Sequence, residues 1–177
     1  MTLIIEDGSV IPGANSFITV AEWEAYLTLY GKTATGDTTA KETALIKAQR
    51  AISTRYTFNG TPVEQGQPTC LPRTWTKTVR GFVPASDAVP QDFKDAQAEL
   101  AYDIQNGADP FATRTSRGEN VTSETSKAGP VETSVTYGGG GSNYDSLDMS
   151  NYTASHALLR PYLAAGSGGA QIRLERA

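Results

Sequence analysis

The sequence is poor in the residue types that disulfide-rich, membrane and many catalytic proteins depend on. It has one cysteine and one histidine, and its hydrophobic fraction is 38%, below the roughly 45–50% of ordinary globular domains. The single cysteine, Cys70, excludes an intrachain disulfide and fits a reducing compartment. No apolar run approaches the roughly 18 residues of a membrane span, and no signal peptide is recognisable. We therefore expect a soluble single domain made in the cytoplasm, with a small core.

Charge of one sign is also lacking. The chain has 15 basic and 19 acidic residues, for a net charge of −4. No global field therefore attracts nucleic acid, and any contact with phosphate must be local.

Large aliphatic side chains are almost absent from residues 112–151, where Thr, Ser and Gly dominate. The stretch contains only Val121, Val131, Val135, Leu147 and Met149, and it includes the glycine run 138–141 followed by Ser142. Ordering a backbone residue costs about 1–2 kcal/mol, which needs apolar burial to offset it. We infer that a neighbouring subunit supplies the missing surface, as in an assembly component. The glycine run lacks the Gly-Lys-Ser/Thr ending of a phosphate loop and is interpreted as a linker.

Helical periodicity and capping signals predict four helices. The capping boxes Thr19–Glu22 and Thr39–Glu42 favour helices over 20–30 and 40–55. Pro90 suits the first turn of a helix over 91–106, and a short helix is expected at about 151–160. Leu3–Ile5 is interpreted as a short strand. The candidate core residues are Trp23, Leu45, Ile52, Phe93, Leu100, Ile104 and Leu158.

The remaining pattern predicts a hairpin and a tail. Residues 119–137 alternate weakly around Ala128-Gly-Pro130, which favours a β-hairpin whose faces are too polar for a deeply buried sheet. The fold class is therefore mainly α: a small helical bundle of about four helices with a β-hairpin arm and an extended C-terminal tail. The tail, Gln171-Ile-Arg-Leu-Glu-Arg176, alternates apolar and charged residues behind a Gly/Ser hinge. It is either a strand added to a partner's sheet edge or a disordered terminus.

No catalytic, cofactor or metal site is predicted. His156 has no nucleophile and orienting group placed around it, and Cys70 has no catalytic motif. An acidic stripe on the third helix is interpreted as a solvated side or a charged subunit contact, with metal binding as the alternative. Its members are Asp92, Asp95, Glu99 and Asp103. We therefore expect that the chain is not an enzyme and uses no cofactor.

One segment has the composition of a nucleic-acid surface. Arg73, Lys77 and Arg80 interleave with Trp75 and Phe82, and aromatic rings stack on bases while cations meet phosphates. The favoured interpretation, however, is that Trp75 anchors the core and that the cations are surface or subunit contacts.

Six segments, taken in order, resemble one family of tailed-bacteriophage proteins. The segments are IIEDGSVIPGANSFITVAEWEAYL, ALIKAQRAISTRYTFNG, LPRTW, VPQDFKDAQAELAYDI, KAGPVETSVTY and ALLRPYL. This order is similar to that of head–tail connector (adaptor) proteins, also labelled DnaT-like single-stranded DNA-binding domains. The resemblance covers roughly residues 3–163.

The resemblance implies a structural virion protein assembled in the host cytoplasm and located at the head–tail interface, in the neck. The subunit would form a homo-oligomer, commonly a dodecameric ring, between the portal protein and a tail-side neck or tail-terminator protein. Genomic DNA would pass through its channel without specific binding, and no membrane would be involved. The alternative function is that of a single-stranded DNA-binding accessory protein using Arg73, Trp75, Lys77 and Arg80.

The same resemblance implies a division of the chain. Residues 1–163 would form the connector domain, with an arm at about 112–150, and residues 164–177 would form a hinge and a portal-docking tail. The tail residues expected at the portal are Gln171, Ile172, Arg173, Leu174, Glu175 and Arg176. The arm residues expected at a neighbouring subunit or the channel are Lys127, Gly129, Val131, Val135 and Tyr137.

Overall fold

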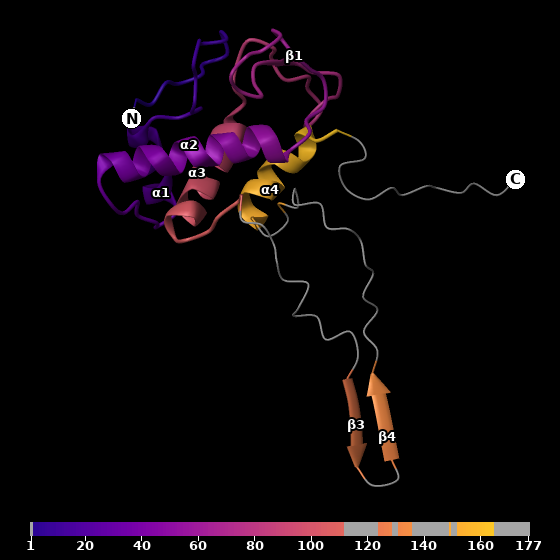
Figure 1. Ribbon diagram of the computed structural model, residues 1–177. Helices are drawn as coiled ribbons and strands as arrows, with labels where there is room; N and C mark the ends of the chain where they lie inside the picture. Colours follow the sequence, from indigo (N-terminus) through magenta and orange to yellow (C-terminus); the bar gives the residue numbers. More distant parts are fainter. Residues whose placement is uncertain (1, 112–123, 129–130, 136–148, 150–151, 165–177) are drawn as a thin grey trace, which may run out of the picture. The chain divides into compact units, whose positions relative to one another are not determined.

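The computed structural model describes residues 2–111, 124–128, 131–135, 149 and 152–164. Within these ranges it confirms a mainly α protein, with four α-helices and a two-stranded antiparallel hairpin (Figure 1). The chain divides into two compact units, one formed by residues 1–110 with 149–177 and the other by residues 111–148. The helices belong to the first unit and the hairpin to the second.

Helix α1, Val20–Leu29, begins at the capping box that the sequence predicts. The Thr19 hydroxyl accepts a hydrogen bond from the Glu22 amide, and the Glu22 carboxylate accepts one from the Thr19 amide. Both exchanges satisfy N–H groups that a helix start leaves unpaired. Trp23 is buried on the inner face of the helix, where its indole N–H donates to the Ala98 carbonyl.

Helix α2, Thr38–Arg55, starts earlier than its sequence suggests. The predicted cap at Thr39 is wrong, because the Asp37 carboxylate accepts a hydrogen bond from the Ala40 amide at 2.8 Å. Both residue types are good caps, so the helix takes the one placed two residues earlier. The buried face carries small and aliphatic residues together with one glutamine: Ala44, Leu45, Ala48, Gln49, Ala51 and Ile52.

Helix α3, Gln91–Gln105, is the central element, because it contacts α1, α2 and α4. Pro90 lies at its N-cap, one position before the predicted first turn. Helix α4, Thr153–Leu159, passes into a short 3₁₀ turn, η1, Arg160–Tyr162. Five of the seven core candidates are buried: Trp23, Leu45, Ile52, Phe93 and Leu100. Ile104 and Leu158 are only half-buried, and Leu159 takes the core position instead.

The core is built around the ring of Phe93. Tyr162 and Phe58 lie 5.0 and 4.9 Å from it, measured between ring centroids, and Phe17 meets it edge to face at 6.3 Å. Such tilted contacts are favourable because the electron-rich ring faces meet electron-poor edges. The cluster joins the N-terminal segment, the residues after α2, helix α3 and the turn η1.

The N-terminal segment is held by one buried carboxylate rather than by a strand. The predicted strand at Leu3–Ile5 is a single β-bridge between Ile5 and Ser16. Glu6, fully buried, accepts hydrogen bonds from the amides of Gly8, Val10 and Ile11. The chain curls around this carboxylate and cannot extend further as a strand.

Between α2 and α3 the chain is mostly irregular, but it contains one small ladder. Strand β1, Thr61–Pro62, pairs antiparallel with β2, Arg73–Thr74. Gly60, just before β1, has φ +76°, and its Cα lies against the Thr74 carbonyl so closely that a Cβ would overlap it. Only glycine fits this crossing without strain.

Candidate functional site

Trp75 lies in the core, as the favoured interpretation of its segment predicts. Its side chain is 6% exposed, and its ring lies 5.3 Å from Tyr162 and 6.0 Å from Phe93. Stacking on a base needs an accessible ring face. The structure therefore confirms the core role of Trp75 and removes it from the candidate nucleic-acid surface.

Arg73 closes the loop that contains β1 and β2. Its guanidinium donates to the carbonyl oxygens of Phe58 and Gly60 at 3.2 and 2.7 Å. Further hydrogen bonds go to the carbonyls of Asn59 and Cys70. Burial lowers the pKa of this half-buried guanidinium, and the carbonyl oxygens occupy the N–H groups that a phosphate would need.

Of the other two cations, Arg80 lies in a tight turn that we call the 79–82 turn, and Lys77 lies just before it. Val79 and Phe82 exchange backbone hydrogen bonds at 2.7 and 3.1 Å. The two residues between them, Arg80 and Gly81, both have positive φ, at 51° and 88°. This is the geometry of the two-residue hairpin turns that place both central residues in the left-handed region. For a non-glycine residue such as Arg80 it stores about 1–2 kcal/mol of strain.

The 79–82 turn presents an aromatic ring with cations beside it. Phe82 is 80% exposed and the next residue, Val83, is 60% exposed. Lys77 is exposed, and the Arg80 side chain is 70% exposed. Lys77, Arg80 and Phe82 are therefore all exposed and close together in sequence. Trp75 is buried and Arg73 is bonded to backbone carbonyls, so neither shares this exposure.

Asp92 at the start of α3 anchors this turn to the end of the helical unit. One carboxylate oxygen accepts a hydrogen bond from the Tyr162 hydroxyl at 2.8 Å, and the other lies 3.3 Å from an Arg80 nitrogen. Burial, together with the hydrogen bond to Asp92, raises the pKa of the Tyr162 phenol. One residue of the acidic stripe thus holds two elements far apart in sequence.

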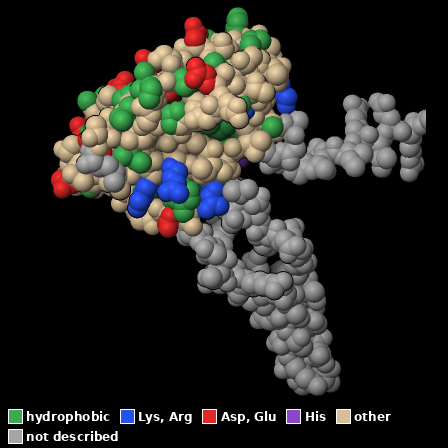
Figure 2. Space-filling model, turned by 45° about the horizontal axis from the view of Figure 1, so that its top comes forward, with side chains coloured by type: hydrophobic (Ala, Val, Ile, Leu, Met, Phe, Trp, Pro, Cys, Tyr) green, Lys and Arg blue, Asp and Glu red, His purple; other side chains and the backbone are tan. Residues whose placement is uncertain are grey.

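Basic side chains are concentrated locally although the net charge is negative. Helix α2 carries four cations against the single acid Glu42: Lys41, Lys47, Arg50 and Arg55. On the face drawn in Figure 2, Lys and Arg side chains gather along one edge of the described helical unit. Net charge by itself therefore does not exclude contact with phosphate.

The rest of the acidic stripe makes ordinary structural contacts. Asp95 accepts a hydrogen bond from Gln91, and Glu99 pairs with Lys32 at 2.5 Å. Glu99 also accepts a hydrogen bond from the Tyr26 hydroxyl at 3.1 Å. Among the described residues, no group of three His, Cys, Asp or Glu side chains is placed to hold a metal ion.

The histidine and the cysteine are both part of the packing. The His156 ring stacks against Tyr56 at 5.9 Å. Burial raises the pKa of the Cys70 thiol to about 11, so little of the reactive thiolate exists at neutral pH. No helix in the described ranges is long and apolar enough to cross a bilayer.

The hairpin predicted within residues 119–137 is present. Strand β3, Glu124–Ala128, pairs antiparallel with β4, Val131–Val135. The register places Lys127 opposite Glu132 and Ala128 opposite Val131. Gly129, Tyr137, the glycine run and the tail at 171–176 lie outside the described residues.

The whole chain, residues 1–177, matches the protein family described as "Putative DnaT-like ssDNA binding protein". The chain belongs to this DnaT-like family. No curated protein and no solved structure matches it.

Membership of the DnaT-like family agrees with one of the two labels that the motif order suggested. The family's description does not mention a phage connector, and it supports the alternative function, binding of single-stranded DNA, more directly. A contact with single-stranded DNA needs exposed cations and an exposed aromatic ring. In this chain Lys77, Arg80 and Phe82 meet that requirement, whereas Arg73 and Trp75 do not.

The exposure of two apolar residues at the end of α1, Leu29 and Tyr30, was not predicted from the sequence. Tyr30, which the helical pattern places on the inner side of α1, is 61% exposed, and the neighbouring Leu29 is 82% exposed. Gly31, with φ +66°, ends the helix directly after them. Their exposure could have been predicted from their position in the last turn before Gly31, because the last turn of a helix often extends past the residues that pack in the core.

Proposed function

We propose that the chain is a structural subunit of a phage head–tail connector, which acts by forming a ring between the portal and the tail. The observation that carries this proposal is the hairpin β3–β4, which belongs to a separate unit formed by residues 111–148. A two-stranded hairpin alone is marginally stable in water. A neighbouring subunit in a ring would supply the surface that such an arm needs.

Two further observations support the connector. The six motifs resemble, in their order, segments of connector proteins, and a mainly helical fold with a hairpin is the architecture that this resemblance implies. The burial of Trp75 and the carbonyl contacts of Arg73 also remove two residues from the rival DNA-binding surface.

The second candidate is a single-stranded DNA-binding accessory protein. The description of the DnaT-like family favours it, and the 79–82 turn supplies a plausible contact, with Phe82 as the stacking ring and Lys77 and Arg80 as phosphate partners. Stacking on one exposed aromatic ring contributes about 1–3 kcal/mol per base. This function would need no ring and no portal.

A comparison of two variants separates the candidates. In the first, residues 124–135 are replaced by a short Gly/Ser linker; in the second, Phe82 is changed to Ala. For a connector, the full chain co-purifies with a cognate portal and forms rings visible by electron microscopy, and only the hairpin replacement abolishes this assembly.

The opposite pattern would overturn the connector. It consists of no portal association by the full chain and salt-dependent binding of a single-stranded oligonucleotide that Phe82→Ala weakens. A salt dependence is expected in that case because each neutralised phosphate releases counterions.

A further inference from the structure

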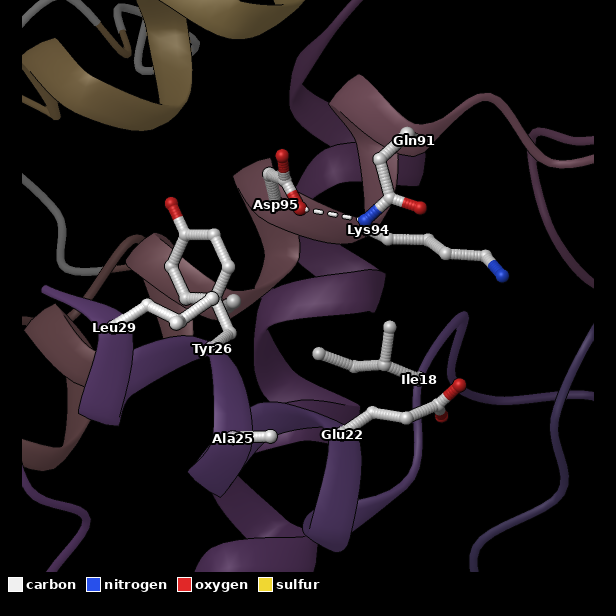
Figure 3. Close-up of a pocket in the computed structure, with 9 residues that line it drawn as sticks. Ile18, Glu22, Ala25, Tyr26, Leu29, Gln91, Lys94 and Asp95 are labelled. Atoms are coloured by element: carbon white, nitrogen blue, oxygen red, sulfur yellow. Dashed lines mark hydrogen bonds between the residues drawn. The ribbon is translucent and has the colours of Figure 1, made fainter.

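A shallow groove runs between α1 and the first half of α3 (Figure 3). It encloses about 290 Å³. Ile18 precedes α1, the remaining lining on that side comes from α1 itself, and residues of α3 line the opposite wall. The lining residues are Ile18, Glu22, Ala25, Tyr26, Leu29, Gln91, Lys94, Asp95 and Ala98.

The groove combines an apolar surface with a charged rim. Leu29 on its wall is 82% exposed, and Figure 3 shows Ile18 and Tyr26 on the same side of the opening. Its volume lies at or below the low end of small-molecule pockets, about 300–1,000 Å³. An exposed apolar strip with a polar rim is instead typical of a protein contact.

The charges on the rim are of mixed sign with an acidic excess. Glu22 and Asp95 are acidic and Lys94 is basic, which gives 1 − 2 = −1. The Thr19 amide and hydroxyl lower the pKa of Glu22, so this carboxylate is ionised at neutral pH. A fitting partner therefore carries a basic excess and a pair of aliphatic side chains.

The C-terminal segment 171–176 of this chain has that composition. Ile172 and Leu174 alternate with charged residues, and Arg173, Glu175 and Arg176 sum to 2 − 1 = +1. In an extended chain, residues two apart lie on one face about 6.6 Å from each other. Two aliphatic side chains would then enter the groove together, and Arg176, which lies on the same face of the extended chain, would lie near the acidic rim residues Glu22 and Asp95.

We propose that residues 171–176 of one copy dock in the α1–α3 groove of a second copy. The inference goes beyond the connector role, because it identifies a contact between subunits that needs neither portal nor DNA. It also gives the tail a binding site on another subunit, whereas the family resemblance implied a binding site on the portal.

A second copy is favoured over the same copy because of where the tail begins. Helices α1 and α4 both contact α3 but not each other, and they lie on opposite sides of it (Figure 1). Ala164, the last described residue before the tail, donates its amide to the Thr57 carbonyl just beyond α2. Residues 165–170 then span at most about 20–22 Å, even fully extended at about 3.3–3.6 Å per residue. The tail thus starts on the side of α3 away from the groove.

The test uses two full-length variants, one in each half of the contact. Leu29→Asp places a charge in the groove at an exposed position, and the double variant Ile172→Asp, Leu174→Asp removes the aliphatic pair from the tail. Self-association is measured by analytical ultracentrifugation over a range of concentrations. We expect each variant alone to associate at least tenfold more weakly than the unchanged chain.

The mixture of the two variants gives the sharper result. It contains one intact groove and one intact tail, so we expect heterodimers that do not grow into larger assemblies. Val83→Asp, which alters an apolar and 60% exposed residue directly after the 79–82 turn, is the matched control and should associate normally.

A peptide covering residues 168–177 keeps the proposal falsifiable if the unchanged chain remains monomeric. The peptide is then titrated into the full chain, and the methyl signals of Ile18 and Leu29 are followed by NMR. Docking should shift both signals. In the Leu29→Asp variant, which retains the Ile18 signal, the peptide should no longer shift that signal. Unchanged signals, normal association by both variants, or tail substitutions that impair only portal binding would overturn the inference.

Discussion

The side-chain oxygen of Gln97, in the middle of α3, accepts a hydrogen bond from the Phe17 amide at 2.8 Å, across 80 residues of sequence. The amide nitrogen of the same glutamine donates to the Leu45 carbonyl and to the Ser16 hydroxyl. Gln97 is fully buried. One polar side chain therefore ties the N-terminal segment, α2 and α3 together at the centre of the helical unit.

Gln97→Leu should destabilise the helical unit by about 2–4 kcal/mol, because it leaves the buried Phe17 amide without its acceptor and removes the hydrogen bonds to Ser16 and Leu45. The free energy of unfolding, measured with urea, checks this. Gln91→Leu is the control, since Gln91 is exposed and bonds only to Asp95. Equal losses in the two variants would show that the buried network contributes nothing specific.

Gly60→Ala should destabilise the protein more than Gly66→Ala. Both glycines have positive φ, +76° and +81°, so each substitution costs about 1–2 kcal/mol of backbone strain. Only at Gly60 would the new Cβ overlap the Thr74 carbonyl, whereas it would meet open space at Gly66. Melting temperatures of the two variants measure the difference, and identical values would contradict the close crossing of the chain.

Trp75→Ala and Phe82→Ala should separate packing from surface function. Trp75 lies in the aromatic cluster, so its removal should cost about 3–5 kcal/mol of stability. Phe82 is 80% exposed, and its removal should change the free energy of unfolding by less than about 0.5 kcal/mol. Chemical denaturation tests both statements. If Trp75→Ala is harmless to stability yet weakens oligonucleotide binding, the assignment of Trp75 to the core is wrong.

Stability should fall between about pH 9 and pH 11 through Cys70. Burial raises the pKa of this thiol from 9.0 to about 11, so the folded state keeps the proton over a range in which the unfolded chain releases it. The stabilisation is complete below the unfolded pKa and is lost as pH rises through the folded one. Urea unfolding at a series of pH values, compared with Cys70→Ala, isolates this contribution. Parallel curves for the two proteins would rule it out.

The features predicted correctly from the sequence are those that depend on neighbouring residues. The capping box of α1 joins two residues three apart, and the buried face of α3 follows from helical spacing alone. The cap of α2 was misplaced because Asp37 and Thr39 are chemically suited to the same task. Local chemistry did not distinguish them.

The properties of the candidate surfaces depended on contacts distant in sequence. Trp75 and Phe82 are both aromatic residues beside cations, yet one packs against Phe93 and Tyr162 while the other is exposed. The difference comes from the return of the chain at η1, some 80 residues later in the sequence, which covers Trp75 alone. The hydrogen bonds from Arg73 to the Phe58 and Gly60 carbonyls likewise form only when the loop between β1 and β2 brings these residues together.

The shared carboxylate of Asp92 makes the 79–82 turn and the start of the C-terminal tail energetically interdependent. An anion that binds Arg80 would break its ion pair with Asp92. The Asp92 carboxylate would then bond to the Tyr162 hydroxyl without a neighbouring cation, which would change the stability of η1. By thermodynamic reciprocity, pulling on the chain beyond η1 would alter the affinity of Arg80 for that anion by the same factor. A ligand bound at the 79–82 turn and tension on the chain beyond η1 would thus be coupled through the side chain of Asp92.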